Sequence, residues 1–143
     1  MVLDLPGVLR ARLKADADVL GHFRQIGGAM ELSAAQRATR TLPAVFVLPL
    51  AESAGMPLWA GEFRQKKELR VALVIAARDV AGGLAAARSI VERVLIPADT
   101  GWLPPGCFDV MAWAEGKLAQ IDDNGCIWWQ DEYATTQFVK TPV

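Results

Sequence analysis

The sequence predicts an α+β fold, a mostly antiparallel four-stranded sheet packed with two main helices in the order α-β-β-α-β-β. Apolar residues recur at intervals of three and four in residues 3–20 and 84–96, which is the pattern of amphipathic helices. Alternating or continuous apolar segments bounded by turn residues indicate strands. These segments are residues 43–49, 62–77, 108–121 and 126–139.

The first helix is expected from Leu3 to Leu20. Pro6 suits its first turn, where a backbone N–H has no helical partner in any case. Glycines then interrupt the chain between residues 21 and 28. The alanine-rich, polar residues 31–40 fit either a short helix or an ordered loop.

The next two strands are expected to form an antiparallel hairpin. Residues 43–49 are a short strand with a proline at each end, and a loop over residues 50–61 leads to a longer strand that begins at Glu62. The first half of this second strand is too charged for burial, so it is expected to project from the sheet. A projecting charged end is typical of an edge that faces a partner, and an ordinary solvated hairpin end fits it as well. One face of the second half carries Leu69, Val71, Leu73 and Ile75, and the other carries Arg70, Ala72, Val74 and Ala76.

The second main helix is expected from Leu84 to Ile96, with Pro97 ending it. The proline- and glycine-rich residues 98–107 read as a loop. The buried stripe of the helix is expected to contain Leu84, Ala87, Val91, Val94 and Leu95.

The last two strands are expected to form a second hairpin. Residues 108–121 form a strand with a break at Gly116, and the turn sequence Asp122-Asp123-Asn124-Gly125 suits a tight connection to residues 126–139. In that last strand, Trp128 and Trp129 point to opposite faces, so at least one indole needs cover from outside the main core.

Size and charge limit the classes of protein that fit. The chain of 143 residues is expected to form a single domain, residues 1–143, and its net charge of -1 gives no basis for nucleic-acid binding. No targeting segment is recognised, and the longest apolar run, near residues 71–77, is too short to span a membrane. Cys107 and Cys126 lack the spacing of a zinc site and are expected to be reduced.

No set of residues forms a catalytic, cofactor-binding or metal-binding template. His22 is a lone histidine at a helix end, and Gly82-Gly83 lacks the surroundings of a phosphate loop. Asp122-Asp123 is better explained by the turn, because calcium needs more oxygen ligands. Asp131 and Glu132 point to opposite faces of a strand and cannot act as a carboxylate pair.

Tryptophan is frequent in this chain. The neighbours of these residues are mostly apolar or acidic, which favours packing in the core or at a subunit interface over stacking on nucleic-acid bases. The five residues are Trp59, Trp102, Trp113, Trp128 and Trp129.

A series of segments along nearly the whole chain matches one known family in order and composition. They are Leu9–Leu13, Leu42–Pro49, Arg70–Ile75, the helix from Gly83, Gly101-Trp102, Glu115–Leu118 and Trp128–Tyr133. In these segments the chain resembles the phage tail terminator family, also called tail-completion proteins.

The resemblance implies a structural protein and no enzyme. Its members are small α+β domains that form a hexameric ring, cap the last layer of the tail tube, stop tube polymerisation and offer a docking surface to the head connector. The implied partners are other copies of the chain, the tail tube protein and the head-tail connector protein. The implied locations are the host cytoplasm during assembly and then the virion tail.

We expect the hairpin over residues 50–67 to reach a neighbouring copy or the tube. A ring of heterologous contacts would also cover the remaining tryptophans. The candidate contacts are Trp59, Glu62, Arg64, Lys66, Lys67 and Arg70; the alternative is that the charged residues are simply solvated strand ends.

Two other classes of protein remain open. One is a small α+β ligand-binding domain or enzyme, which a deep pocket near Trp102 and Trp113 with a buried charged group would favour. The other is a monomeric or dimeric adaptor that binds one other protein, and the oligomeric state distinguishes it from a ring.

Overall fold

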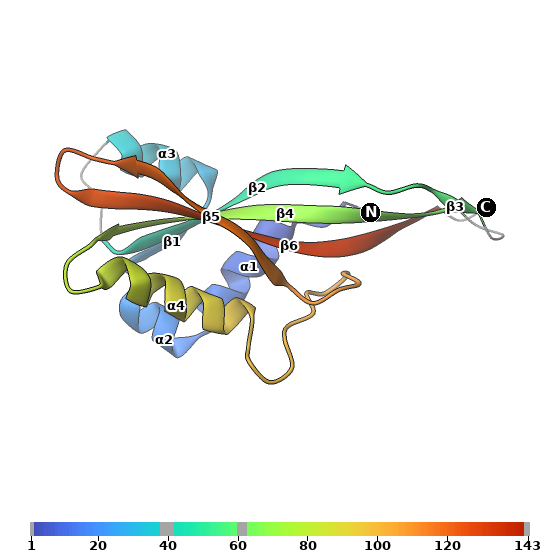
Figure 1. Ribbon diagram of the computed structural model, residues 1–143, viewed down its shortest axis with the longest axis horizontal. Coiled ribbons are helices and arrows are strands. Elements are labelled where there is room, and N and C mark those ends of the chain that lie inside the picture. Colours follow the sequence, from blue (N-terminus) through green and yellow to red (C-terminus); the bar gives the residue numbers. More distant parts are fainter. Residues whose placement is uncertain (1, 38–41, 60–62, 142–143) are drawn as a thin grey trace.

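The computed structural model describes residues 2–37, 42–59 and 63–141. Within these ranges the fold is α+β, with a mixed six-stranded sheet and four helices (Figure 1). The helices are α1 Leu5–Lys14, α2 Ala17–His22, α3 Ala29–Arg37 and α4 Gly83–Leu95. The strands are β1 Gln25–Gly27, β2 Ala44–Ala54, β3 Leu58–Trp59, β4 Phe63–Arg78, β5 Ala112–Ile121 and β6 Cys126–Thr141.

The predicted α+β class is confirmed, and the sheet is mostly antiparallel as predicted, but the described residues form six strands and four helices where four strands and two main helices were predicted. The strand order is β1-β2-β4-β6-β5, and β3 pairs with the first two residues of β4, Phe63 and Arg64. β1 runs parallel to β2, whereas the other pairs are antiparallel. The two missed strands, β1 and β3, contain only three and two residues, which is too short for a periodic pattern to show.

The single helix predicted over residues 3–20 is two helices. α1 ends before Ala15, and Asp16 begins α2 by accepting hydrogen bonds from the backbone N–H groups of Asp18 (2.9 Å) and Val19 (3.1 Å). In one continuous helix these two N–H groups would donate to backbone carbonyls of the preceding turn. Here the Asp16 carboxylate accepts them instead, as an N-cap residue does, so a new helix begins after Asp16. Residues 29–37 form α3, so the open choice between a helix and a loop over residues 31–40 is decided in favour of a helix for residues 31–37. Residues 38–40 of that prediction lie outside the described residues.

Two of the three central strands, β2 and β6, are longer than predicted, and β6 continues to Thr141. β2 continues to Ala54, so the loop predicted over residues 50–61 is wrong for its first five residues. The register of β2 against β4 shifts between Pro49 and Ala51, because a bulge lies there. β5 begins at Ala112 and passes through Gly116 without the predicted break.

Other predictions are confirmed. α4 lies within one residue of its predicted bounds, and residues 98–107 contain no helix or strand. The turn before β6 places Gly125 at φ 76°, a left-handed conformation that glycine adopts without strain. Trp128 pairs with Ala76 and Trp129 pairs with Ile75, so the two indoles do lie on opposite faces.

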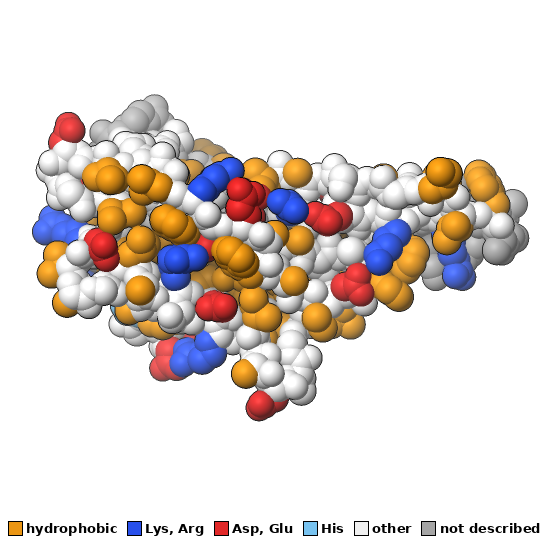
Figure 2. Space-filling model, viewed as in Figure 1, with side chains coloured by type: hydrophobic (Ala, Val, Ile, Leu, Met, Phe, Trp, Pro, Cys, Tyr) orange, Lys and Arg blue, Asp and Glu red, His pale blue; other side chains and the backbone are white. Residues whose placement is uncertain are grey.

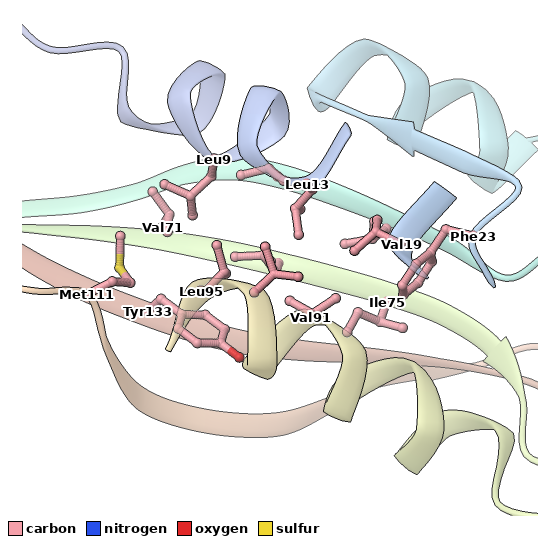
Figure 3. Close-up of a cluster of buried hydrophobic side chains, with 14 of the residues drawn as sticks. Leu9, Leu13, Val19, Phe23, Val71, Ile75, Val91, Leu95, Met111 and Tyr133 are labelled. Carbon is pink, nitrogen blue, oxygen red and sulfur yellow. The ribbon is translucent and has the colours of Figure 1, made fainter. Parts of the chain in front are cut away.

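The main core lies between the sheet and helices α1, α2 and α4 (Figure 3). We call this side of the sheet the helix face. Leu9 and Leu13 of α1 and Val91 and Leu95 of α4 pack on the odd-numbered apolar residues of β4. Those residues are Leu69, Val71, Leu73 and Ile75, as the alternation predicted.

A smaller core lies on the opposite side, which we call the α3 face. Trp128 stacks on Phe46 there with ring centroids 6.3 Å apart, and Ala35 of α3 covers them. Cys126 is buried in this cluster, while Cys107 is half-buried elsewhere, and both thiols are free. Burial raises the pKa of the Cys107 thiol.

Candidate assembly surfaces

A three-stranded ribbon projects from the body of the molecule (Figure 1). β4 and β6 pair over their whole length of sixteen residues, from Phe63 with Thr141 to Arg78 with Cys126. The helices cover only the half of these strands that is apolar. We call the uncovered half the arm: residues 50–54 of β2, β3, residues 63–68 of β4 and residues 136–141 of β6. The charged side chains of Arg64 and Lys66 are exposed there, so this part of β4 keeps charge in water without helical cover.

The arm carries most of the candidate contacts predicted from the sequence. Trp59 is 74% exposed near its tip, Arg64 and Lys66 are exposed further along β4, and Arg70 lies at its base. Lys67 points to the helix face, whereas Arg64, Lys66 and Arg70 point to the α3 face. Glu62, the remaining candidate, lies outside the described residues.

Lys66, Lys67 and Arg70 each have an acidic partner. Lys67 pairs with Glu52 (3.4 Å), and Lys66 pairs with Asp109 (3.5 Å). The Lys66 and Asp109 side chains are 50% and 48% exposed, and exposed pairs contribute roughly 0–1 kcal/mol, so a partner molecule can exchange this pair at little cost. Lys67 is less accessible, because its side chain is 15% exposed.

Arg70 is held more firmly than the other cations. It contacts Glu68 (3.0 Å) and the buried Glu132 (3.3 Å), which also accepts from Lys117 (3.2 Å). Burial alone would raise the pKa of Glu132, but the hydrogen bonds from Lys117, Gln130 and Arg70 hold that pKa below its usual range. Arg70 therefore anchors the base of the arm and is the least available of these cations for an outside contact.

The connection between α4 and β5 binds the arm to the body. We call residues 97–111 the strap. The backbone N–H of Phe108 donates to the carbonyl of Thr136 (2.7 Å), and the Thr136 hydroxyl donates to the Asp109 carboxylate (2.6 Å). The rings of Phe108 and Phe138 meet edge to face, with centroids 4.7 Å apart. The strap thus fixes the angle at which the arm leaves the body.

We expect acid to loosen the strap. The hydrogen bond from Thr136 and the charge of Lys66 hold the pKa of Asp109 below its usual range. A carboxyl group whose pKa is lower in the folded protein stabilises it above the unfolded pKa, and this contribution is lost as the pH falls through the folded value. Amide exchange of Phe108 should therefore speed up, relative to that of α4, as the pH falls below the ordinary aspartate range.

The matched variant for this test is Asp109→Asn. It should show fast exchange at Phe108 already at neutral pH and no further change on acidification beyond that of α4. Exchange at Phe108 with the same pH dependence in both proteins would contradict the role given to Asp109.

A second exposed surface lies on the helix face beside α4. We call Trp113, Leu118 and Ile121 of β5, with the half-buried Trp129 of β6, the α4–β5 face. Figure 2 shows this side of the molecule, with hydrophobic side chains over β5 and the adjoining part of β6. Trp113 is 47% exposed and Ile121 is 61% exposed. Trp113, Leu118 and Ile121 were not predicted as a surface.

An ion pair with two indole donors lies under this face. Arg88 of α4 donates from two nitrogens to the carboxylate of Asp131, at 2.9 and 2.8 Å. The indole N–H groups of Trp113 and Trp129 both donate to Asp131 Oδ1 at 3.1 Å. Asp131 is 2% exposed, and the guanidinium of Arg88 lies 4.7 Å from the ring centre of Trp129. The bond to Asp131 raises the pKa of Arg88, so the pair is charged and its net charge is zero.

A pocket of about 290 Å³ opens between α4 and β5 above this pair. This volume is just below the roughly 300–1,000 Å³ typical of small-ligand sites, and Trp102 takes no part in the pocket. Trp102 instead lies under the guanidinium of Arg12, 4.3 Å away. The lining residues are Ala85, Arg88, Ser89, Glu92, Trp113, Asp131 and Tyr133.

Tyr133 is a second buried residue with a polar group in this pocket, besides Asp131. Its ring belongs to the main core, and its hydroxyl makes no hydrogen bond with any described residue. Burial, with the nearby charges of Asp131 and Glu92, raises the pKa of Tyr133. The hydroxyl is therefore a neutral donor at the wall of an open pocket.

The described part of the chain shows no metal site, since nowhere in it do three His, Cys, Asp or Glu side chains come together. None of its helices is both long enough and apolar enough to cross a membrane.

A projecting arm and a separate exposed apolar face are surfaces of the kind that contact other proteins. The chain belongs to the phage tail terminator family: the family model described as "Phage tail terminator protein" matches residues 2–142. The protein is therefore a structural component of a phage-type tail. No curated protein matches the chain.

The fold occurs in solved structures. A chain from the "Virion of native gene transfer agent (GTA) particle" superposes with a TM-score of 0.56 at 14% sequence identity, covering 92% of each chain. At this identity the likeness establishes the arrangement of helices and strands and leaves the contacts of individual residues to be derived from this chain.

Proposed function

We propose that six copies of this protein form a ring that caps the tail tube, ends its polymerisation and presents a docking surface to the head-tail connector. The family supports this function, and the observation that carries it is the arm. A projecting ribbon with exposed apolar residues at its tip and the exposed cations Arg64 and Lys66 along β4 is suited to reach another molecule.

The partners that follow are other copies of this chain, the tail tube protein and the connector protein. The protein acts in the host cytoplasm during assembly and stays in the virion tail. In this function it is a structural protein and catalyses no reaction.

A ring requires two different surfaces on each subunit that bind each other, because contacts of one surface with its own copy produce only dimers. The arm and the α4–β5 face are two such separate surfaces. Their presence on one chain supports a ring over the dimeric adaptor that the sequence left open.

Reversing two arm charges tests the function. We expect the double variant Arg64→Glu/Lys66→Glu to bind tube ends or neighbouring copies at least about tenfold more weakly, since like charges placed across an interface repel. Both side chains are exposed, so the free energy of unfolding should change by less than about 1 kcal/mol. The measurement counts capped tube ends by electron microscopy after mixing with the matching tail tube protein.

The matched control is Lys14→Glu/Arg24→Glu, which makes the same charge change on exposed residues of the body. Equal capping by the arm variant and this control would remove the arm from the proposed function. Tubes that grow to the same lengths with and without the wild-type protein would contradict termination itself.

A further inference from the structure

Two groups of exposed large apolar side chains lie at separate places on the molecule. One is the arm tip, formed by Met56, Leu58 and Trp59, and the other is the α4–β5 face. Each group is costly to leave in water, and exposed apolar patches bordered by polar residues are typical of protein contacts. In the single chain neither group covers the other, because the arm tip lies far from β5 and α4 (Figure 1).

We propose that the α4–β5 face of one copy binds the arm tip of the next copy. This inference rests on the proposed ring and identifies both sides of its repeated contact. The contact is heterologous: each copy supplies an arm to one neighbour and a face to the other. A heterologous contact is the type that closes into a ring.

Charge agrees with this pairing. On the arm, Arg64 stands directly opposite Leu58 in the β3–β4 register, so a cation lies beside an apolar residue. On the face, Asp131 neutralises Arg88, and Glu92 leaves the pocket with a net negative charge. In this contact, Arg64 and Leu58 of one arm would meet the acidic pocket and the apolar side chains of the neighbouring α4–β5 face.

The walls of the pocket suit an arginine or lysine side chain. The exposed indole of Trp113 offers an aromatic surface, and aromatic rings attract cations. Glu92 offers a carboxylate, and Ser89 and the unbonded Tyr133 hydroxyl offer oxygen atoms. Tyr133 is buried within the single chain and would gain a partner in the assembled state.

A mixing experiment tests the pairing. We expect the arm variant Trp59→Asp and the face variant Ile121→Asp each to fold normally and to lose ring formation, with roughly 30-fold weaker self-association. An equimolar mixture should form a dimer of one copy of each and nothing larger. The arm variant keeps a working face and the face variant keeps a working arm, so only one contact can form.

A charge exchange tests the same contact independently. Glu92→Arg and Arg64→Glu should each weaken assembly by about tenfold, and the double variant should recover it, because the new charges again oppose each other across the contact. Glu115→Arg, on the opposite face of β5, is the control and should assemble as the wild type does.

The outcomes separate this inference from the proposed function. If the wild-type protein and the face variant both form rings, the pairing of arm tip and α4–β5 face is wrong, while the proposed ring stands. A mixture without mixed dimers would also overturn it. Rings from the face variant that fail to cap tubes would assign the face to the tube protein. Absence of wild-type rings would overturn the proposed function itself.

Discussion

Replacing Asp131 with alanine is expected to cost about 3 kcal/mol of the free energy of unfolding. The buried carboxylate accepts two hydrogen bonds from Arg88 and one each from Trp113 and Trp129. Its loss leaves a cation and two indole N–H groups without their acceptor. Breaking a buried pair costs about 3–5 kcal/mol, and the lower value applies because Arg88 is 34% exposed and water can reach it.

Urea unfolding followed by circular dichroism measures this loss. Asp123→Ala is the control, because Asp123 is an exposed turn residue and its removal should change stability by less than about 0.5 kcal/mol. A loss below about 1 kcal/mol for Asp131→Ala would show that the ion pair does not hold α4 to the β5–β6 hairpin.

The second large effect is expected from Trp128→Ala, at about 3–5 kcal/mol. Trp128 is 2% exposed, stacks on Phe46, and donates from its indole N–H to Asp122 Oδ2 at 3.3 Å. Alanine would leave a cavity in the smaller core and separate the turn before β6 from the strand.

Trp59→Ala is the matched control for this variant. The same substitution on the exposed arm tip should change the free energy of unfolding by less than about 0.5 kcal/mol, although it weakens assembly. Equal losses for the two variants in guanidinium unfolding would contradict the placement of Trp128 under α3.

The parts of the fold that the sequence predicted are those with a strong local pattern. The period-two alternation of β4 places Leu73 and Ile75 on the helix face, and the stripe of α4 buries Val91 and Leu95. The turn before β6 also follows from local chemistry, since Asn124-Gly125 favours a tight connection.

The missed parts depend on contacts that are distant along the chain. β1 is a strand only because Gln25–Gly27 lies beside β2, and three residues carry no period. Residues 50–54 of β2 lack strand-like alternation and are held extended by pairing with β4. Asp16 interrupts an apolar spacing that otherwise continues through both helices.

The candidate site shows the same division. The exposed cations of the arm follow from sequence alone, but their acidic partners, such as Asp109 for Lys66, come from distant segments. The α4–β5 face was missed because β5 has two register shifts, between Trp113 and Glu115 and between Leu118 and Gln120. These bulges bring Trp113, Leu118 and Ile121, which are five and three residues apart, to one face, so the period of two that marks a strand does not reveal them.

Light scattering after size exclusion, with electron microscopy of the same fractions, tests the proposed assembly most directly. We expect a concentration-dependent particle of six copies of the 15.5 kDa chain, seen as a closed six-fold ring in which each arm lies on the next subunit. A stable two-fold dimer joined through identical surfaces, or a chain that stays monomeric at every concentration, would contradict the ring.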